Sequence, residues 1–326
     1  MQPADLAPRA FSTVGLPAAR RVELWETHNA TALIGLDVQA SEPLVATELN
    51  VRLPLVNLAR VSGSAHMVHR TKKVIERIPD DAIAVYMTLR GDAWFGCADR
   101  THTLRPSNVL ICETNQPFVR GFRHGLEELV VKVDRAVLPE VPRLGRPVIT
   151  CFRNDGPSDQ YARALARIAS QTTRISSPLP PDENTVLNLV AVLVAGRAAA
   201  PATAHRAAAR SYIEEHLTNP RLGADQVATA IGISERQLSR IFAADGTSIP
   251  RHILSRRLDL AYSVLVNAAD GNQIETVADI AAQCGFTSAA YFSHAFRQHF
   301  RHRASDTRGS ASSVTAAPEA SPTDVR

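Results

Sequence analysis

Residues 235–244 carry side chains that could read the base sequence of DNA. Three apolar residues, Leu238, Ile241 and Phe242, share one face of the helix predicted here, so they would face a protein core. The opposite face carries Arg236, Gln237, Ser239 and Arg240. Side chains of these types hydrogen-bond base edges in the major groove, and an arginine can make two bonds to guanine O6 and N7. These four residues are therefore predicted to contact DNA.

A second candidate recognition helix, about residues 288–300, offers different chemistry. Its candidates for DNA contact are Ala289, Ala290, Tyr291, Ser293, His294 and Arg297. No arginine precedes Arg297 in this helix. Methyl contacts with thymine, a hydroxyl or imidazole hydrogen bond, and phosphate contacts from Arg297 and Arg301 are expected instead. We infer that the two helices read DNA unequally, and that the first makes the stronger base-specific bonds.

Both recognition helices end a pattern that occurs twice within residues 222–300. Val227 and Ile280 hold equivalent positions 53 residues apart, and Leu238 and Phe292 hold equivalent positions 54 residues apart. Each copy has alanine where a second helix must approach, a glycine at the turn, and a polar residue that can cap the next helix. In a helix-turn-helix, this arrangement presents a helix to the major groove.

The sequence from about residue 205 predicts an all-helical domain around these two turns. The expected helices are residues 208–217, 224–231, 235–244, 250–265 and 288–300. Ser234 and Gln237 have the S-x-x-Q spacing of a capping box at the first recognition helix. The helix at 250–265 would act as a rigid joint, because two recognition helices that read adjacent major grooves lie about 34 Å apart.

The N-terminal half has the pattern of an antiparallel β protein that follows a helix at residues 18–36. Short apolar runs alternate with turn residues, which favours a β-sandwich or barrel. The runs are residues 45–58, 65–73, 82–89, 93–97, 109–112, 118–122 and 129–133. Strands are expected to stop after Val133. A small barrel of this kind can hold a ligand in its mouth.

Two helices, residues 158–173 and 182–196, and a linker at 198–204 are expected to join the halves. The second helix is apolar over most of its circumference, so it must be buried either against the barrel or in a dimer. The fold class is α+β. The predicted domains are a regulatory domain with its N-terminal helix at 1–175, a helical connector and linker at 176–205, the double helix-turn-helix at 206–308, and a disordered tail at 309–326.

Composition is that of a two-domain globular protein. The chain has 326 residues, of which 45% are apolar, and its net charge of +4 is compatible with nucleic acid binding. No run of about eighteen apolar residues could span a bilayer, and the N-terminus lacks the apolar core of a signal peptide, so we expect a cytoplasmic location without membrane association. The four cysteines have no C-x-x-C spacing, which argues against a disulfide framework or a zinc site.

Residues 206–308 resemble the DNA-binding domain of the AraC/XylS family of bacterial transcription regulators. The match includes the run Ile280-Ala281-x-x-Cys284-Gly285-Phe286-x-Ser288-x-x-Tyr291-Phe292-Ser293-x-x-Phe296-Arg297. Residues 40–175 resemble, more loosely, the ligand-binding-like domain of one branch of the family. The resemblance implies a cupin-like sensor half and a promoter-binding regulator, usually an activator that contacts RNA polymerase. One departure is that Arg301 and Ala304 replace the family's turn Gly and Pro, which could change the position of the last turn and helix.

Several residues have alternative interpretations. His66 and His69 could suggest a cupin metal site, but residues three apart on a strand point to opposite faces, so no metal and no cofactor are predicted. Four residues could line an effector pocket or form ordinary barrel core: Tyr86, Met87, Trp94 and Phe95. Cys284 takes the place of Ile231 in the repeat and is therefore predicted to be core.

The predicted function is that of a sequence-specific regulator of transcription, not an enzyme. We expect it to bind double-stranded DNA, contact RNA polymerase and respond to a small-molecule effector. A homodimer is one possible oligomeric state. The alternatives are a cupin-class enzyme and a repressor with the same DNA-binding domain. A fused DNA-repair methyltransferase would need a Pro-Cys-His-Arg site, which the sequence lacks.

Overall fold

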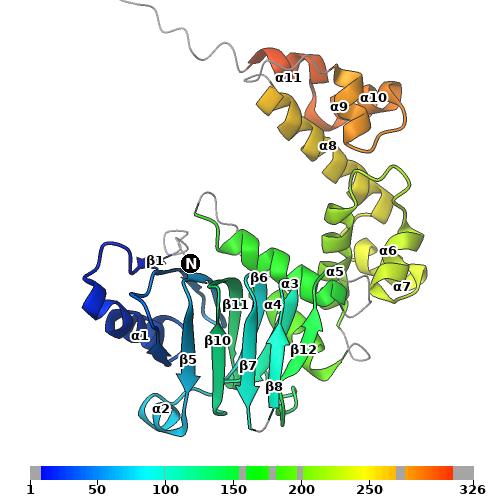
Figure 1. Cartoon of the computed structure of the whole chain (residues 1–326). Coiled ribbons are helices and arrows are strands. Elements are labelled where there is room, and N and C mark those ends of the chain that lie inside the picture. The colour runs from blue at the N-terminus through cyan, green and yellow to red at the C-terminus, as the bar shows by residue number, and fades with distance from the viewer. Residues whose placement is uncertain are drawn as a thin grey trace, which may run out of the picture. The chain divides into compact units, whose positions relative to one another are not determined.

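The computed structural model describes residues 9–98, 100–153, 159–175, 181–196, 201–268 and 276–310. The chain divides into two compact units. The first comprises residues 1–211 and 230–232, and the second comprises residues 212–229 and 233–326. Each unit is described by itself (Figure 1). A loose leader is expected at residues 1–13, but Arg9–Ser12 form strand β1; residues 1–8 and most of the predicted tail, residues 311–326, lie outside the described residues.

Two antiparallel sheets form the first unit, as the cupin-like prediction requires. Among the described residues, one sheet has seven strands in the order β1-β3-β4-β11-β6-β9-β12, and the other has five in the order β2-β5-β10-β7-β8. The strands of the larger sheet are β1 (Arg9–Ser12), β3 (Ala46–Arg52), β4 (Val56–Gly63), β6 (Ala82–Arg90), β9 (Asn108–Glu113), β11 (Leu126–Asp134) and β12 (Val148–Cys151). Those of the smaller sheet are β2 (Asp37–Gln39), β5 (His66–Arg70), β7 (Ala93–Cys97), β8 (Arg100–Leu104) and β10 (Phe118–Phe122).

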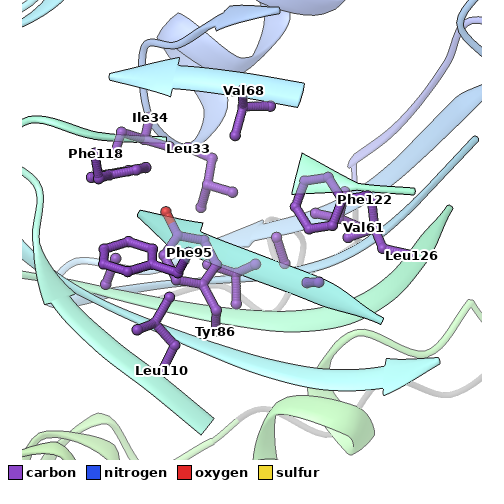
Figure 2. Close-up of a cluster of buried hydrophobic side chains, with 14 of the residues drawn as sticks. Leu33, Ile34, Val61, Val68, Tyr86, Phe95, Leu110, Phe118, Phe122 and Leu126 are labelled. Carbon is purple, nitrogen blue, oxygen red and sulfur yellow. The ribbon is translucent and has the colours of Figure 1, made fainter. Parts of the chain in front are cut away.

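The core of the first unit lies between the two sheets. Figure 2 shows Tyr86 and Phe95 among other buried side chains there. Strand β6 is buried along nearly its whole length, because helix α3 (Asp159–Thr172) packs against β4 and β11 of the same sheet and thus covers its outer face. Arg60 of β4 links β11 and α3, since its guanidinium donates to the Glu127 carboxylate at 2.8 Å and to the Ser170 hydroxyl at 3.0 Å.

Helices complete the first unit. The N-terminal helix α1 (Arg21–Ala32) follows a 3-10 turn (Ala18–Arg20) and contributes Trp25 to the core. Helix α2 (Lys72–Arg77) follows β5, a second 3-10 turn (Arg135–Val137) follows β11, and α4 (Glu183–Ala195) packs against α3. The predicted helices at 158–173 and 182–196 therefore occur as α3 and α4.

Four sequence predictions for this half were wrong. The run 45–58 is not one strand but the hairpin of β3 and β4, and Pro54 in its turn was the signal that was missed. Strands continue past Val133, since the short strand β12 pairs with β9. Strand β8, with the mostly polar sequence RTHTL, was missed because three of its five residues are exposed. The expected linker at 198–204 overlaps helix α5, which begins at Ala202.

The second unit is all-helical. Its elements are the end of α5 (Ala202–Glu215), most of α6 (Ala224–Ile231), α7 (Glu235–Ala243), α8 (Ile249–Ala268), α9 (Val277–Gln283), α10 (Ala289–Phe300) and α11 (Ala304–Ser310). The predicted helix at 224–231 has the observed bounds, and the other predicted helices differ by a few residues at their ends. The repeat is visible in burial, because most of its equivalent apolar residues, such as Val227 and Ile280 or Leu238 and Phe292, are at most 2% exposed. The pair after the turn glycines is less buried, since Ile233 is half-buried and Phe286 is 8% exposed.

Candidate nucleic-acid interface

Helix α7 has the two faces that the sequence predicted. Leu238, Ile241 and Phe242 are buried. On the other face, Arg236, Ser239 and Arg240 are exposed and Gln237 is half-buried. The Ser234 hydroxyl caps the helix by accepting a hydrogen bond from the Gln237 backbone N–H at 3.2 Å. The helix therefore presents two arginines and a hydroxyl to solvent from a fixed backbone.

Helix α10 presents a less basic face. The candidate residues Ala289, Ala290, Tyr291, Ser293, His294 and Arg297 are all exposed. Tyr291 stands out because a large aromatic side chain is 54% exposed there. The Ser288 hydroxyl caps the helix at the Tyr291 N–H, 3.3 Å away. The Ser293 hydroxyl already donates to the Ala289 carbonyl at 2.9 Å, so DNA would have to compete with this bond or share the oxygen as an acceptor.

Both turns rely on a glycine in the left-handed conformation. Gly232 has φ 71° and Gly285 has φ 83°. At Gly285 a side chain would also collide, because a Cβ atom there would lie 2.9 Å from the Leu217 carbonyl oxygen. The same carbonyl accepts a hydrogen bond from Arg257 of α8 at 2.9 Å. The second turn is thus fixed against the end of α5 through α8.

The two adjacent arginines of α8 stabilise the unit and are not free for DNA. Arg256 forms ion pairs with Glu214 and Asp259. Arg257 donates to the Leu217 and Asn219 carbonyls. Arg257 lies within residues 206–308, which resemble the family's DNA-binding domain, but the resemblance does not show this role. The sequence does show an acidic residue, Glu214, on the first helix of this unit, but only the fold shows that its carboxylate pairs with Arg256.

A capping box that the sequence analysis missed starts helix α9. The Thr276 hydroxyl accepts from the Asp279 N–H at 3.1 Å, and the Asp279 carboxylate accepts from the Thr276 N–H at 2.9 Å. The Thr276 hydroxyl also donates to the Asp279 carboxylate at 2.7 Å, and this bond, with the one from the Thr276 N–H, holds the pKa of Asp279 below its usual range. The T-x-x-D spacing was readable in the sequence.

The last helix begins after a turn at Arg301. Arg301 has φ 67° and ends α10 in the left-handed conformation, where the family has glycine. Ala304, which replaces the family proline, is buried and starts α11. The turn thus keeps a left-handed geometry despite the replacement, at a cost in backbone strain.

Polar side chains also meet inside the first unit, and the sequence analysis missed two of them. Arg120 of β10 and Glu128 of β11 form a two-bond ion pair across the interior, at 3.0 and 2.6 Å. Of the four residues with two interpretations, Met87 and Phe95 are core, Tyr86 lines a cavity beside Arg120, and Trp94 is half-buried against Gly121. Arg120 could have been found from the sequence, because it lies two residues from both Phe118 and Phe122 and therefore shares their inward-facing side of the strand.

The two histidines of β5 separate as the strand geometry requires. His66 lines the interior cavity, and its Nδ1 lies 2.7 Å from the Ser64 carbonyl oxygen. His69 is not among the residues that line the cavity. No group of three or more His, Cys, Asp or Glu side chains that could hold a metal ion occurs within the described ranges.

Cys284 is buried in the second helix-turn-helix, as predicted. Among the described residues, no helix is long and apolar enough to cross a membrane.

Comparisons with known proteins match both units. Residues 30–218 match the family model of the AraC-binding-like domain, and residues 227–310 match a helix-turn-helix domain. The transcriptional activator RhrA of Rhizobium meliloti is 33% identical over 31% of this chain, and the match covers 32% of RhrA. The transcriptional activator NphR of a Rhodococcus species is 22% identical over 75% of each chain. The crystal structure of the AraC-like transcriptional activator CuxR aligns with 18% identity and a TM-score of 0.45, over 78% of this chain and 95% of that chain.

Proposed function

The chain belongs to the AraC family of DNA-binding transcription regulators, which are not enzymes. We propose that it activates a nearby promoter when its N-terminal unit binds a small molecule. Activation is supported by two relatives, RhrA and NphR, which are both named as transcriptional activators. An activator acts through the transcription machinery, so RNA polymerase is the proposed protein partner and the cytoplasm the proposed location.

DNA binding is supported by two capped helices, α7 and α10, each of which has one buried and one exposed face. We propose the exposed residues of α7 and α10 as the DNA contacts. Arg236 and Arg240 would make base-specific bonds in the first groove. Tyr291, His294 and Arg297 would make weaker base and phosphate contacts in the second. A homodimer is proposed through the half-buried apolar side of α4, where Leu187, Leu193 and Val194 retain accessible surface.

The interior of the first unit is the proposed effector site. A ligand that binds one state of the protein better than another shifts the population of that state. The cavity beside Tyr86 and Arg120 offers polar groups in an apolar enclosure, which is the usual composition of a small-molecule site.

A footprint on DNA upstream of the neighbouring operon tests this function. The wild-type protein should protect two adjacent major grooves. Arg240→Ala should weaken binding by about 10- to 100-fold, which corresponds to about 1–3 kcal/mol, and relax preference at one base pair. His294→Ala should have a smaller effect, because a single imidazole bond is replaced.

The matched control is Arg105→Ala, which removes the same charge from an exposed loop of the first unit and should leave the footprint unchanged. A larger effect of His294→Ala than of Arg240→Ala would reverse the assignment of the two helices. The absence of protection at moderate salt, with folded protein, would refute the proposed DNA contacts. Transcription from the same promoter with and without effector separates an activator from a repressor.

A further inference from the structure

The buried ion pair between Arg120 and Glu128 joins the two sheets of the first unit. Their side chains are 3% and 5% exposed. The Arg120 guanidinium lies 3.8 Å from the centre of the Tyr86 ring and 4.9 Å from that of Phe122. Burial lowers the pKa of Arg120, but Glu128 together with Tyr86 and Cys112 raises it, and the net shift is upward, so the guanidinium stays charged. The site therefore contains one positive and one negative charge that neutralise each other.

Two polar atoms next to this pair have no partner. The Tyr86 hydroxyl and the Nε–H of Arg120 are buried without a hydrogen bond to any described residue. Buried polar groups in native proteins almost always have a partner, either protein, water or ligand. Tyr86 and Arg120 line one cavity, so water or a ligand in that cavity can supply the missing partners.

This cavity has a volume of about 30 Å³. It has room for about two water molecules. Its other walls are largely apolar and include Trp25, Leu33 and Val61, and Figure 2 shows Leu33 near Tyr86 and Val61 beside Phe122. Two polar groups without a partner are the hydroxyl of Tyr86, which can donate or accept, and the Nε–H of Arg120, which can only donate; Asn29 and His66 also line the cavity. An occupant must therefore offer a hydrogen-bond acceptor at this end and an apolar body at the other.

The ion pair also sets the charge of the occupant. A carboxylate would be repelled by Glu128, and an ammonium group would be repelled by Arg120. Either one would bring an unpaired charge into a buried site, which costs several kcal/mol. An uncharged group avoids this cost and can still accept from Arg120 and Tyr86.

We propose that this cavity binds a small uncharged molecule in which a carbonyl-type hydrogen-bond acceptor is attached to a short apolar group. This inference rests on the proposed function, because such a molecule would be the effector. Tyr86 and the Nε of Arg120 bind the acceptor, Glu128 holds Arg120 in place and excludes anions, and Trp25 contacts the apolar end. In this arrangement of its walls the cavity admits only a few non-hydrogen atoms.

Titration with isosteric pairs tests the charge rule directly. The probes are formamide against formate, and acetamide against acetate, at pH 7.5, because larger amides exceed the cavity of about 30 Å³. The chain has two tryptophans, so Trp94→Phe leaves Trp25 as the only indole that reports binding by fluorescence. Each amide should change the Trp25 emission saturably, and each carboxylate should bind at least about tenfold more weakly.

Two variants assign the polar groups. Tyr86→Phe removes one hydroxyl and should weaken amide binding about two- to tenfold. The matched control, Tyr262→Phe, removes a hydroxyl from the second unit and should leave amide binding unchanged. Glu128→Gln leaves Arg120 with an uncompensated charge and should reverse the preference, so that the carboxylates bind more tightly than the amides. If that variant does not fold, Tyr86→Phe still decides the role of the site.

Three results would overturn the inference. They are equal binding of amide and carboxylate, amide binding that is insensitive to Tyr86→Phe, and the absence of a saturable signal with every probe, which would make the cavity a hydration site only. The footprint of the same proteins keeps the two proposals apart. Intact DNA protection with no probe binding would refute the ligand inference alone, whereas a folded wild-type protein without protection would refute the proposed function.

Discussion

Burial determines the protonation of the ionisable side chains in both units. It raises the pKa of Tyr86 well above its usual range, so the hydroxyl keeps its proton and remains a donor. It also raises the pKa of the Cys284 thiol to about 11, so this cysteine is a protonated core residue at neutral pH. Since the thiolate is the reactive form, the structure supports the interpretation of Cys284 as core.

His66 should make the stability of the first unit depend on pH. Burial lowers its pKa below 6.5, although the Ser64 carbonyl and Glu128 oppose the shift. The unfolded chain therefore binds a proton at a higher pH than the folded chain does. The free energy of unfolding should fall as pH drops below about 6.5, by at most about 1.4 kcal/mol per pH unit, and level off below the folded pKa.

Urea unfolding at pH 7.5 and 5.5 measures this dependence. His66→Asn retains a donor for the Ser64 carbonyl and cannot titrate, so the difference between the two pH values should shrink in this variant. His299→Asn, at an exposed position of α10, is the control and should behave as the wild type. An identical pH dependence in His66→Asn would show that His66 does not become protonated on unfolding in this range.

At the scale of elements, the ends of the helices are held unequally. Helix α9 has a reciprocal capping box at Thr276, and α7 and α10 have a serine cap. Helix α10 ends instead at Arg301 in the left-handed conformation, which costs a residue with a Cβ about 1–2 kcal/mol. The second recognition helix, α10, therefore begins at a serine cap and ends at a residue with backbone strain.

Arg301→Gly should therefore stabilise the second unit. Glycine relieves the strain at φ 67° but adds freedom to the unfolded chain, so we expect a net gain of about 0.5–1 kcal/mol in the free energy of unfolding. The measurement is urea unfolding followed by the exchange protection of α10 amides. Arg303→Gly makes the same change outside the left-handed region and should give no gain. A loss of stability in Arg301→Gly would mean that the arginine side chain makes a stabilising contact that exceeds the strain.

At the scale of the whole molecule, the two units each have a buried core of their own. The second helix-turn-helix packs on Leu258 and Leu265 of α8, within its own unit. The unit boundary at residue 211 falls inside α5, whereas the sequence placed the domain boundary at residue 205. Helix α5 begins at Ala202, so a fragment cut at residue 206 would lack the first turn of that helix.

A fragment of residues 201–310 should bind DNA without the first unit. It retains all of α5 and both recognition helices, so it should protect the same sequence as the full chain and show no dependence on effector. Footprinting of the fragment beside the full chain provides the comparison. A folded fragment that fails to bind would show that the first unit contributes to DNA binding, for example by holding two copies together.

The second unit was predictable because its signals are local. Apolar spacing of three and four, a glycine at each turn and a serine cap all lie within about 20 residues, and the same pattern occurs twice. Those features predicted α6, α7 and α10 with their exposed faces. The contacts of Arg256 and Arg257 were not predictable, because their partners on α5 and the following loop lie about 40 positions earlier in the chain.

The first unit was predictable in class but not in detail. Turn residues and short apolar runs indicated two packed sheets, but Pro54 is the only turn residue between β3 and β4, β8 is mostly polar, and β12 has only four residues. The sequence by itself determined the two helix-turn-helix copies and the existence of a β-rich half, because short-range periodicity encodes both. Only the tertiary structure decided that Arg120 and Glu128 face each other across the interior, since that depends on which sheet each strand joins and which face of it is buried.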